Sequence, residues 1–270
     1  MLTFQSLTGL KTGSILWIQV SYGEPAQLSI SQQPSNSTGG TPLLFQPRIE
    51  VLDLGGARVL NASILVCAAL VSEHALKLGY NPMPAQILGT TTVQVVRGFA
   101  SFTDLVVNVA AHGYYFNFTS IFTTAKTRTR SGSTMVSAHS NHLSSLSSSF
   151  SILAGPPSAL FVVQQPLTWT FGGQAILRQP SIAVTDAGGN PTSACPFRVS
   201  AQISVNGAVS GKLSGNNTAA SIASAHTLAN EMANFTDLSL DCTGAGYILS
   251  FRATLSAGTR SQSTTCNVVW

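Results

Sequence analysis

Hydrophobic and polar residues alternate with a period of two along many short segments of the chain. In one of the clearest segments, Tyr114, Phe116 and Phe118 alternate with more polar neighbours. This spacing places apolar side chains on one face of a strand and polar side chains on the other. Turn residues such as Gly188-Gly189 separate the segments. The pattern therefore predicts an all-β chain built of short, half-buried strands.

The pattern occurs twice, at a spacing of 133 residues. The motif Phe102-Thr103-Asp104-Leu105 returns as Phe235-Thr236-Asp237-Leu238, and 235 minus 102 is 133. Agreement at one spacing along much of the chain indicates a tandem repeat. Other pairs at this spacing are Gly40 and Gly173, Gln46-Pro47 and Gln179-Pro180, Asp53 and Asp186, Gly55-Gly56 and Gly188-Gly189, and Gly113-Tyr114 and Gly246-Tyr247.

The repeat divides the chain into three parts. Residues 1–24 imitate the end of a copy, and we interpret them as the C-terminal strands of a preceding module. Residues 25–155 form a complete copy with a serine-rich insertion at 131–149, expected to be a solvated loop or, alternatively, an O-glycosylated or partner-binding one. Residues 156–270 form a further copy whose last strand is incomplete. We interpret the chain as an excerpt from a longer array.

For the fold class we expect tandem immunoglobulin-like antiparallel β-sandwich modules. Each copy contains about eight short strand-like runs and no long amphipathic helix, which is typical of this sandwich. Proline-containing linkers at residues 22–25 and 154–157 separate the parts. Because proline stiffens so short a linker, the modules should be held nearly end to end.

The composition narrows the range of partners. Charged residues make up only 8% of the chain, against about 25% in an ordinary soluble domain. The net charge of +4 is small and scattered, which excludes nucleic acid as the main partner. Hydroxyl and amide side chains replace charge, which favours an extracellular location. The longest apolar run, residues 64–71, is far shorter than the roughly 20 residues of a spanning helix, so we expect no membrane insertion.

The chain contains five Asn-X-Ser/Thr sites for N-glycosylation. Asn117 and Asn234 should point outward, since inward phenylalanines flank Asn117 and follow Asn234. We predict that some of the five carry glycans, the alternative being ordinary polar surface. The candidates are Asn36, Asn61, Asn117, Asn216 and Asn234.

Four cysteines permit three fully paired arrangements, and none recurs at the repeat spacing. We favour a disulfide between Cys195 and Cys242, which lie in loops beside strands that a sandwich would bring close. Cys67 lies in an apolar run and is expected to be a buried free thiol.

No catalytic, cofactor-binding or metal-binding residue is predicted, and we expect no enzyme. The nine acidic residues form no catalytic pair. Asp53 and Asp186 recur in both copies, as expected of residues that cap turns, and a calcium site at Asp186 would need a denser acidic cluster. Trp169 is a candidate interface anchor, with stacking on a sugar ring as the alternative.

The motifs of the second copy, taken in order, resemble a known class of repeats. They are Gln164-Gln165-Pro166, Asp186-Ala187-Gly188-Gly189-Asn190, Leu213-Ser214-Gly215, Phe235-Thr236-Asp237-Leu238 and Gly246-Tyr247-Ile248-Leu249-Ser250-Phe251. This order is similar to the Ig-like repeats of large secreted surface proteins, both bacterial proteins and the glycoproteins of mastigonemes, the hairs on algal flagella. The first copy departs from it at Ala57-Arg58, where the second has Asn190-Pro191. The resemblance implies a structural or adhesive function and supplies no catalytic residues.

From these features we expect a structural shaft component of an extracellular filament or cell-surface appendage. The resemblance includes a flagellar surface among the locations. Neighbouring Ig-like modules, other filament subunits and covalent glycans are the expected partners. The alternative is an adhesin ectodomain that binds a ligand or carbohydrate through Trp169 or the serine-rich insertion.

Overall fold

The computed structural model describes twelve parts of the chain. They are residues 19–72, 75–78, 83–122, 127–130, 133–136, 142–192, 197–205, 213–215, 218–220, 232–241, 243–255 and 265–268. All regular elements in these parts are strands, arranged in several antiparallel sheets. The prediction of an all-β chain is therefore confirmed. Below, "first repeat" means residues 25–155 and "second repeat" means residues 156–270.

The first repeat contains strands β1 to β14. Their bounds are β1 Gln27–Gln32, β2 Ser37–Thr38, β3 Arg48–Leu52, β4 Ile64–Val71, β5 Leu76–Lys77, β6 Ile87–Leu88, β7 Thr92–Gln94, β8 Phe99–Ser101, β9 Val106–Val107, β10 Ala111–Phe122, β11 Thr127–Arg130, β12 Ser133–Val136, β13 Ser144–Leu146 and β14 Phe150–Leu153. The order β1-β3-β8 makes a three-stranded sheet, and β2-β14-β10-β4-β7 is the main path of a larger one. The pair β2–β14 is parallel, whereas the others are antiparallel.

One hydrophobic core joins these two sheets. Ile49 and Val51 of β3 lie in the same buried cluster as Phe116 and Phe118 of β10. These residues follow the period of two in the sequence, because alternate residues of a strand share a face. The core therefore consists of the residues that the alternation marked as inward.

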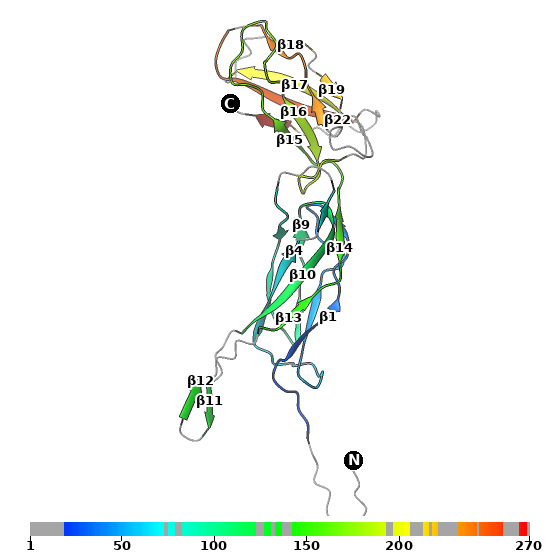
Figure 1. Cartoon of the computed structure of the whole chain (residues 1–270), viewed down its shortest axis with the longest axis vertical. Coiled ribbons are helices and arrows are strands. Elements are labelled where there is room, and N and C mark those ends of the chain that lie inside the picture. Colours follow the sequence, from blue (N-terminus) through cyan, green and yellow to red (C-terminus); the bar gives the residue numbers. More distant parts are fainter. Residues whose placement is uncertain are drawn as a thin grey trace, which may run out of the picture.

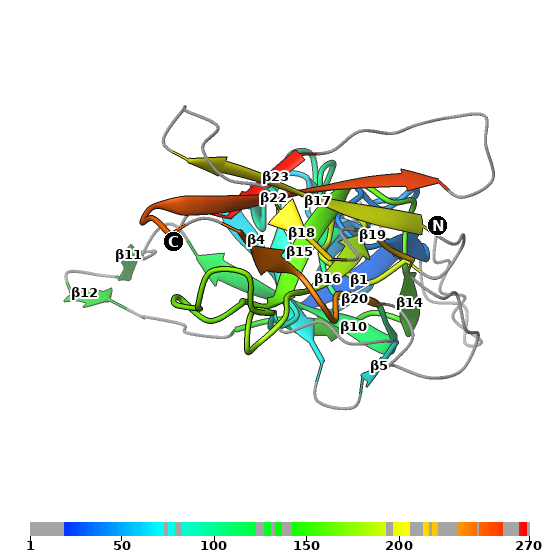
Figure 2. The same cartoon turned by 90° about the horizontal axis from the view of Figure 1, so that it is seen from above.

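The second repeat contains strands β15 to β23. Their bounds are β15 Ala159–Gln164, β16 Ser181–Thr185, β17 Phe197–Val205, β18 Leu213–Ser214, β19 Thr218–Ala220, β20 Met232–Asn234, β21 Ser239–Leu240, β22 Tyr247–Leu255 and β23 Thr265–Val268. The sheets β15-β16-β20 and β19-β17-β22-β23 share a second hydrophobic core. The described strands of the two repeats follow one another along the long axis of the molecule (Figure 1). Seen along that axis, the second repeat lies over the first (Figure 2).

The repeats agree in atomic detail as well as in sequence. In the first, the Gln46 side chain donates to the carbonyls of Leu43 and Leu105 and accepts from the Leu105 N–H. In the second, Gln179 makes the same three bonds with Ile176 and Leu238. Each of these residues stands 133 positions after its counterpart. The repeated glutamine thus ties the loop before β3 or β16 to the loop after β8 or β20.

Part of the serine-rich insertion differs from the expected solvated loop. Ser144–Leu146 forms β13, which pairs with β10. Ser147 is buried, and its hydroxyl accepts from the Phe116 N–H at 2.9 Å while donating to the Ser148 carbonyl. A serine can be buried here because its hydroxyl is satisfied in both directions. Residues 131–132 and 137–141 lie outside the described parts, and β11 and β12 form a separate hairpin (Figure 1).

The expected strands within residues 1–24 are not tested over most of their length. Residues 1–18 lie outside the described parts. Residues 19–24 contain no strand.

Candidate functional site: the junction between the repeats

An aspartate-centred turn follows β16. Asp186 is 2% exposed, and its Oδ1 accepts from the backbone N–H groups of Gly188 at 2.9 Å and Asn190 at 2.8 Å. The Asn190 side-chain amide also donates to both carboxylate oxygens, at 3.1 and 3.0 Å. This is how an aspartate side chain shapes a turn. We call residues 186–190 the docking turn.

Asn190 connects the docking turn to the first repeat. Its Oδ1 accepts from the Ala110 N–H at 2.7 Å, and its Nδ2 donates to the Asn108 carbonyl at 2.7 Å. The whole residue is buried, with 0% of its surface exposed. Loss of these partners from a buried amide would lower the free energy of unfolding by about 1–3 kcal/mol. Asn190 therefore bonds at the same time to its own turn and to the neighbouring repeat.

The surface that receives this turn is held by further bonds within the first repeat. Asn108 is 5% exposed, and its side chain accepts from the Gln86 N–H at 2.7 Å and donates to the Pro84 carbonyl at 3.1 Å. The Gly40 N–H donates to the Val107 carbonyl at 3.1 Å. We call residues 39–40 and 108–110 the acceptor surface.

Glycines allow the two surfaces to touch backbone to backbone. A Cβ at Gly39 would lie 2.0 Å from Asn190 Nδ2, and one at Gly188 would lie 2.1 Å from the Asn108 carbonyl oxygen. At Gly40 a Cβ would lie 2.4 Å from the carbonyl carbon of Ala187. All three distances are too short for any side chain, so the contact requires glycine. At Gly40 and Gly188 the repeats thus approach each other backbone to backbone, and at Gly39 the glycine leaves room for the Asn190 side chain.

The linker between the repeats is bound to the same carboxylate. Asp186 Oδ2 accepts from the Gly155 N–H at 2.8 Å. A Cβ at Gly155 would lie 3.3 Å from the Thr38 Cβ and 3.4 Å from the Asp186 Cβ. The chain therefore leaves the first repeat under direct restraint from the second, as well as from the prolines that follow Gly155.

The first repeat holds the linker before it in the same way. Asp53 accepts from the N–H groups of Gly23 at 2.7 Å, Gly55 at 2.9 Å and Ala57 at 2.8 Å. The Gly23 N–H, followed by that of Ala57, holds the pKa of the Asp53 carboxyl below its ordinary value, although desolvation opposes the shift. Ala57 replaces Asn190 at the end of this turn, so no side-chain amide is available there to bond a neighbour.

The far end of the second repeat presents the counterpart of the acceptor surface. The Gly173 N–H donates to the Leu240 carbonyl, as Gly40 does to Val107. Gly173 has a φ of +73°, against +74° for Gly40, but a Cβ there would meet no described atom within 4 Å. The same backbone geometry is therefore present without a docked turn.

The predicted glycosylation sites occupy different surroundings. Asn36, Asn61 and Asn234 are exposed, and Asn117 is half-buried on the face of β10 opposite Phe116 and Phe118. Each exposed one makes a hydrogen bond: Asn36 accepts from the Ser151 N–H, Asn61 donates to the Tyr22 hydroxyl, and Asn234 accepts from the Ser181 hydroxyl. Asn216 lies outside the described residues. The four described sites make no hydrogen bonds with one another.

The other predicted residues do not meet at the junction. Cys195 and Cys242 lie outside the described residues, so their pairing stays a prediction. Cys67 is a free, half-buried thiol. Trp169 is 57% exposed and makes an edge-to-face pair with Phe171, with ring centroids 5.7 Å apart.

Sequence reasoning identified Asp186 as a turn residue but missed the junction itself. The partners of Asn190 are 80 and 82 positions away, and no local pattern links them. The available signals were the glycine doublets at 39–40 and 188–189, which mark close approaches of the backbone.

Comparison with known proteins does not assign the chain to a family. No family model and no curated protein sequence matches the chain. It is similar to solved structures of β-glucuronidase from Parabacteroides merdae, at 10% identity and a TM-score of 0.27, and of apo β-glucuronidase 3 from Bacteroides uniformis, at 11% and 0.27. The alignments cover 92% and 90% of this chain, which spans about a quarter (25%) of each of those chains. A likeness at this TM-score carries no weight for fold or activity.

No helix among the described residues has the length and apolar character needed to cross a membrane. Within the same parts of the chain, no group of three or more His, Cys, Asp or Glu side chains is placed to hold a metal ion.

Proposed function

We propose that this chain is a structural shaft segment of an extracellular filament or cell-surface appendage. In this proposal the two repeats are immunoglobulin-like β-sandwiches, each with two facing sheets and one core. The observation that carries the proposal is the junction, where a buried carboxylate binds both its own turn and the linker, and Asn190 binds the preceding repeat. A junction with several buried hydrogen bonds restrains bending between the repeats. A load-bearing shaft requires this restraint, whereas independently moving domains lack it.

The proposal also accounts for the open end of the second repeat. The hydrogen bond between Gly173 and Leu240 reproduces the one between Gly40 and Val107, which lies beside the residues that the docking turn contacts. A further module with an aspartate-centred turn would fit there as the second repeat fits the first. Repetition of one junction gives an array whose length grows with the number of modules.

Low charge suits this role. With 8% charged residues, contacts between modules rest on backbone hydrogen bonds and apolar packing rather than on ion pairs. Such contacts change little with salt, so an extracellular shaft of this kind keeps its stiffness in media of variable ionic strength.

Immunogold labelling tests the role directly. Antibodies raised against the purified chain should label surface appendages of intact cells, at intervals along their length. Label confined to the cell interior, or scattered over the membrane with none on appendages, would contradict the proposal.

One observation favours a second candidate, a carbohydrate-binding adhesin. Trp169 and Phe171 are 57% and 68% exposed and form a paired aromatic surface. Exposed aromatic rings stack on sugars, although they also anchor protein interfaces. Binding to a glycan array that is lost in Trp169→Ala would favour the adhesin, whereas loss of self-association in the same variant would favour the shaft.

A further inference from the structure

An open hollow lies on the first repeat, away from the junction. It has a volume of about 730 Å³ and is lined by residues of β3, β7 and β8 and of the turns beside them. Three arginines line it in a chain that has only thirteen basic residues. The lining residues that matter here are Arg48, Arg58, Arg97, Phe99, Gln94 and Asn61.

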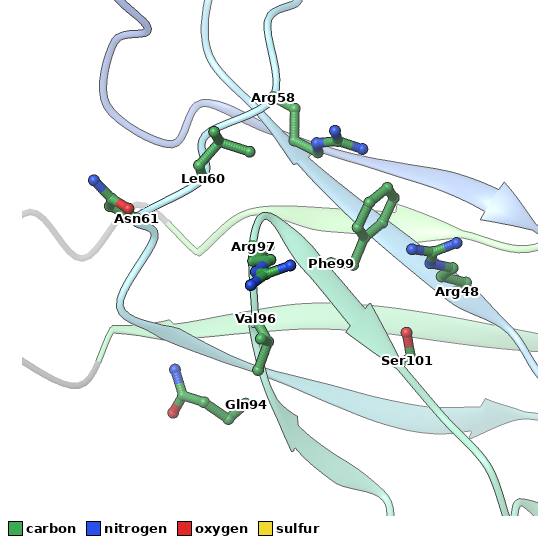
Figure 3. Close-up of a pocket in the computed structure, with 9 residues that line it drawn as sticks. All are labelled: Arg48, Arg58, Leu60, Asn61, Gln94, Val96, Arg97, Phe99 and Ser101. Carbon is green, nitrogen blue, oxygen red and sulfur yellow. The ribbon is translucent and has the colours of Figure 1, made fainter.

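Phe99 makes cation–π contacts with two of the guanidinium groups. The Arg48 guanidinium carbon lies 3.6 Å from the centroid of the Phe99 ring, and that of Arg58 lies 4.4 Å from it. Figure 3 shows these two groups and that of Arg97 arranged around the ring. Contact with an aromatic face orders an arginine while leaving its N–H groups available for a ligand.

Negative charge does not cancel this cluster. Arg58 makes an ion pair with Glu50 at 3.4 Å. Within the described residues, Arg97 has no hydrogen bond or ion pair, and Arg48 contributes its guanidinium only to Phe99. The cluster thus contains three positive guanidinium groups and one negative carboxylate, so the hollow carries a net positive charge.

The backbone at Arg97 is strained. Val96 and Phe99 exchange backbone hydrogen bonds across a two-residue turn, and both Arg97 and Gly98 have positive φ, at 51° and 79°. A long side chain in this left-handed region costs roughly 1–2 kcal/mol relative to the usual backbone. Asparagine or glycine would adopt this backbone at a lower cost in free energy than arginine.

The fold itself does not need these arginines. The second repeat builds the equivalent sheet from β15, β16 and β20, with Ser181↔Asn234 in the register of Arg48↔Ser101. At the repeat spacing, Arg48, Arg58, Arg97 and Phe99 correspond to Ser181, Pro191, Asn230 and Met232. The cationic cluster is therefore specific to the first repeat.

We propose that this hollow binds an anionic polysaccharide through the carboxylate or sulfate groups on its sugar rings. The guanidinium forks of Arg48, Arg58 and Arg97 match the two oxygens of such groups. Gln94 and Asn61 also line the hollow; each amide NH2 group donates one hydrogen bond, to the Ile64 carbonyl and the Tyr22 hydroxyl, which leaves the second N–H and the amide oxygen to bond sugar hydroxyls. The exposed side chains of Leu60 and Val96 offer apolar surface to a ring face. An acidic polypeptide has the same charge but no hydroxyl-bearing rings to use the amides.

The test uses the full chain made in bacteria, so that Asn61 carries no glycan. Binding of dextran sulfate, polygalacturonate, neutral dextran and polyglutamate is measured by calorimetry. The test variant is Arg48→Ser/Arg97→Asn, which installs the residues of the second repeat. The matched control is Arg198→Ser/Arg252→Ser, which removes the same charge from exposed positions of β17 and β22.

We expect binding of at least one of the two acidic polysaccharides and none of neutral dextran. The test variant should weaken this binding at least tenfold, and the control by less than twofold. Thermal unfolding of the test variant should stay close to the wild-type temperature, because relief of the strain at position 97 offsets the lost contact between Arg48 and Phe99. Equal losses in test and control variants would show non-specific attraction to a polyanion and overturn the proposal. Equally tight binding of polyglutamate, or no binding of either acidic polysaccharide, would also overturn it.

Discussion

The last residue differs between the two aspartate-centred turns of this chain. Asp53 and Asp186 bind their turns and linkers in the same way, but Ala57 ends the first turn and Asn190 ends the second. The asparagine adds two bonds to the neighbouring repeat. At the scale of single residues, the last position of the turn therefore determines whether a side-chain amide is available to bond a neighbouring repeat.

Replacing Asn190 tests this directly. Asn190→Ala leaves the Ala110 N–H and the Asn108 carbonyl without their partner, so the free energy of unfolding should fall by about 1–3 kcal/mol. Hydrogen exchange should accelerate at the Ala110 amide and stay unchanged at Gln86, which is bonded to Asn108 instead. Unchanged protection at Ala110 would show that the Asn190 bond is not made in solution.

The linker before the first repeat should respond to acid. The pKa of Asp53 is lowered from 3.8 in the folded chain, mainly by the Gly23 N–H, so the unfolded chain takes up its proton first as pH falls. The stabilisation is complete above the unfolded value and is lost as pH falls through the folded one. The amide resonance of Gly23 should shift over that range in the wild type and not in Asp53→Asn. A Gly23 resonance that moves equally in both would contradict the assignment.

At the scale of elements, alternation in the sequence predicted the strands and their inward residues well. It did so because a strand's two faces are set by local spacing. It missed β13, since a serine-rich segment has too few apolar residues to show alternation, and its place depends on pairing with β10 and on the buried Ser147. The junction was missed because its bonds join loops from different repeats, and no local pattern in the sequence links those loops.

The glycines of the junction provide a matched pair of substitutions. Gly40→Ala and Gly173→Ala both place a side chain at nearly the same positive φ, so each should lose roughly 1–2 kcal/mol from backbone strain. Only at Gly40 would the new Cβ also meet the docking turn, 2.4 Å from Ala187. Chemical denaturation should therefore show a larger loss for Gly40→Ala, with faster exchange at Ala110. Equal effects of the two substitutions would mean that the repeats do not touch there.

At the scale of the whole molecule, hydrogen bonds across the linker join the two repeats. Each has its own core, but the carboxylate of Asp186 and the amide of Asn190 belong to a network that spans the linker. The sequence predicted repeats joined by short linkers. It also predicted, from the prolines, that the repeats are held nearly end to end, but not the bonds that join them, because their partners lie 80 or more positions apart.

Small-angle X-ray scattering of the full chain tests the rigid junction most directly. The wild type should scatter as one elongated particle, with a single well-defined longest dimension that is the same at low and high salt. Asn190→Ala/Gly40→Ala should broaden the distribution of dimensions while each repeat stays folded by circular dichroism. A wild-type profile that only an ensemble of freely jointed repeats can fit would contradict the account.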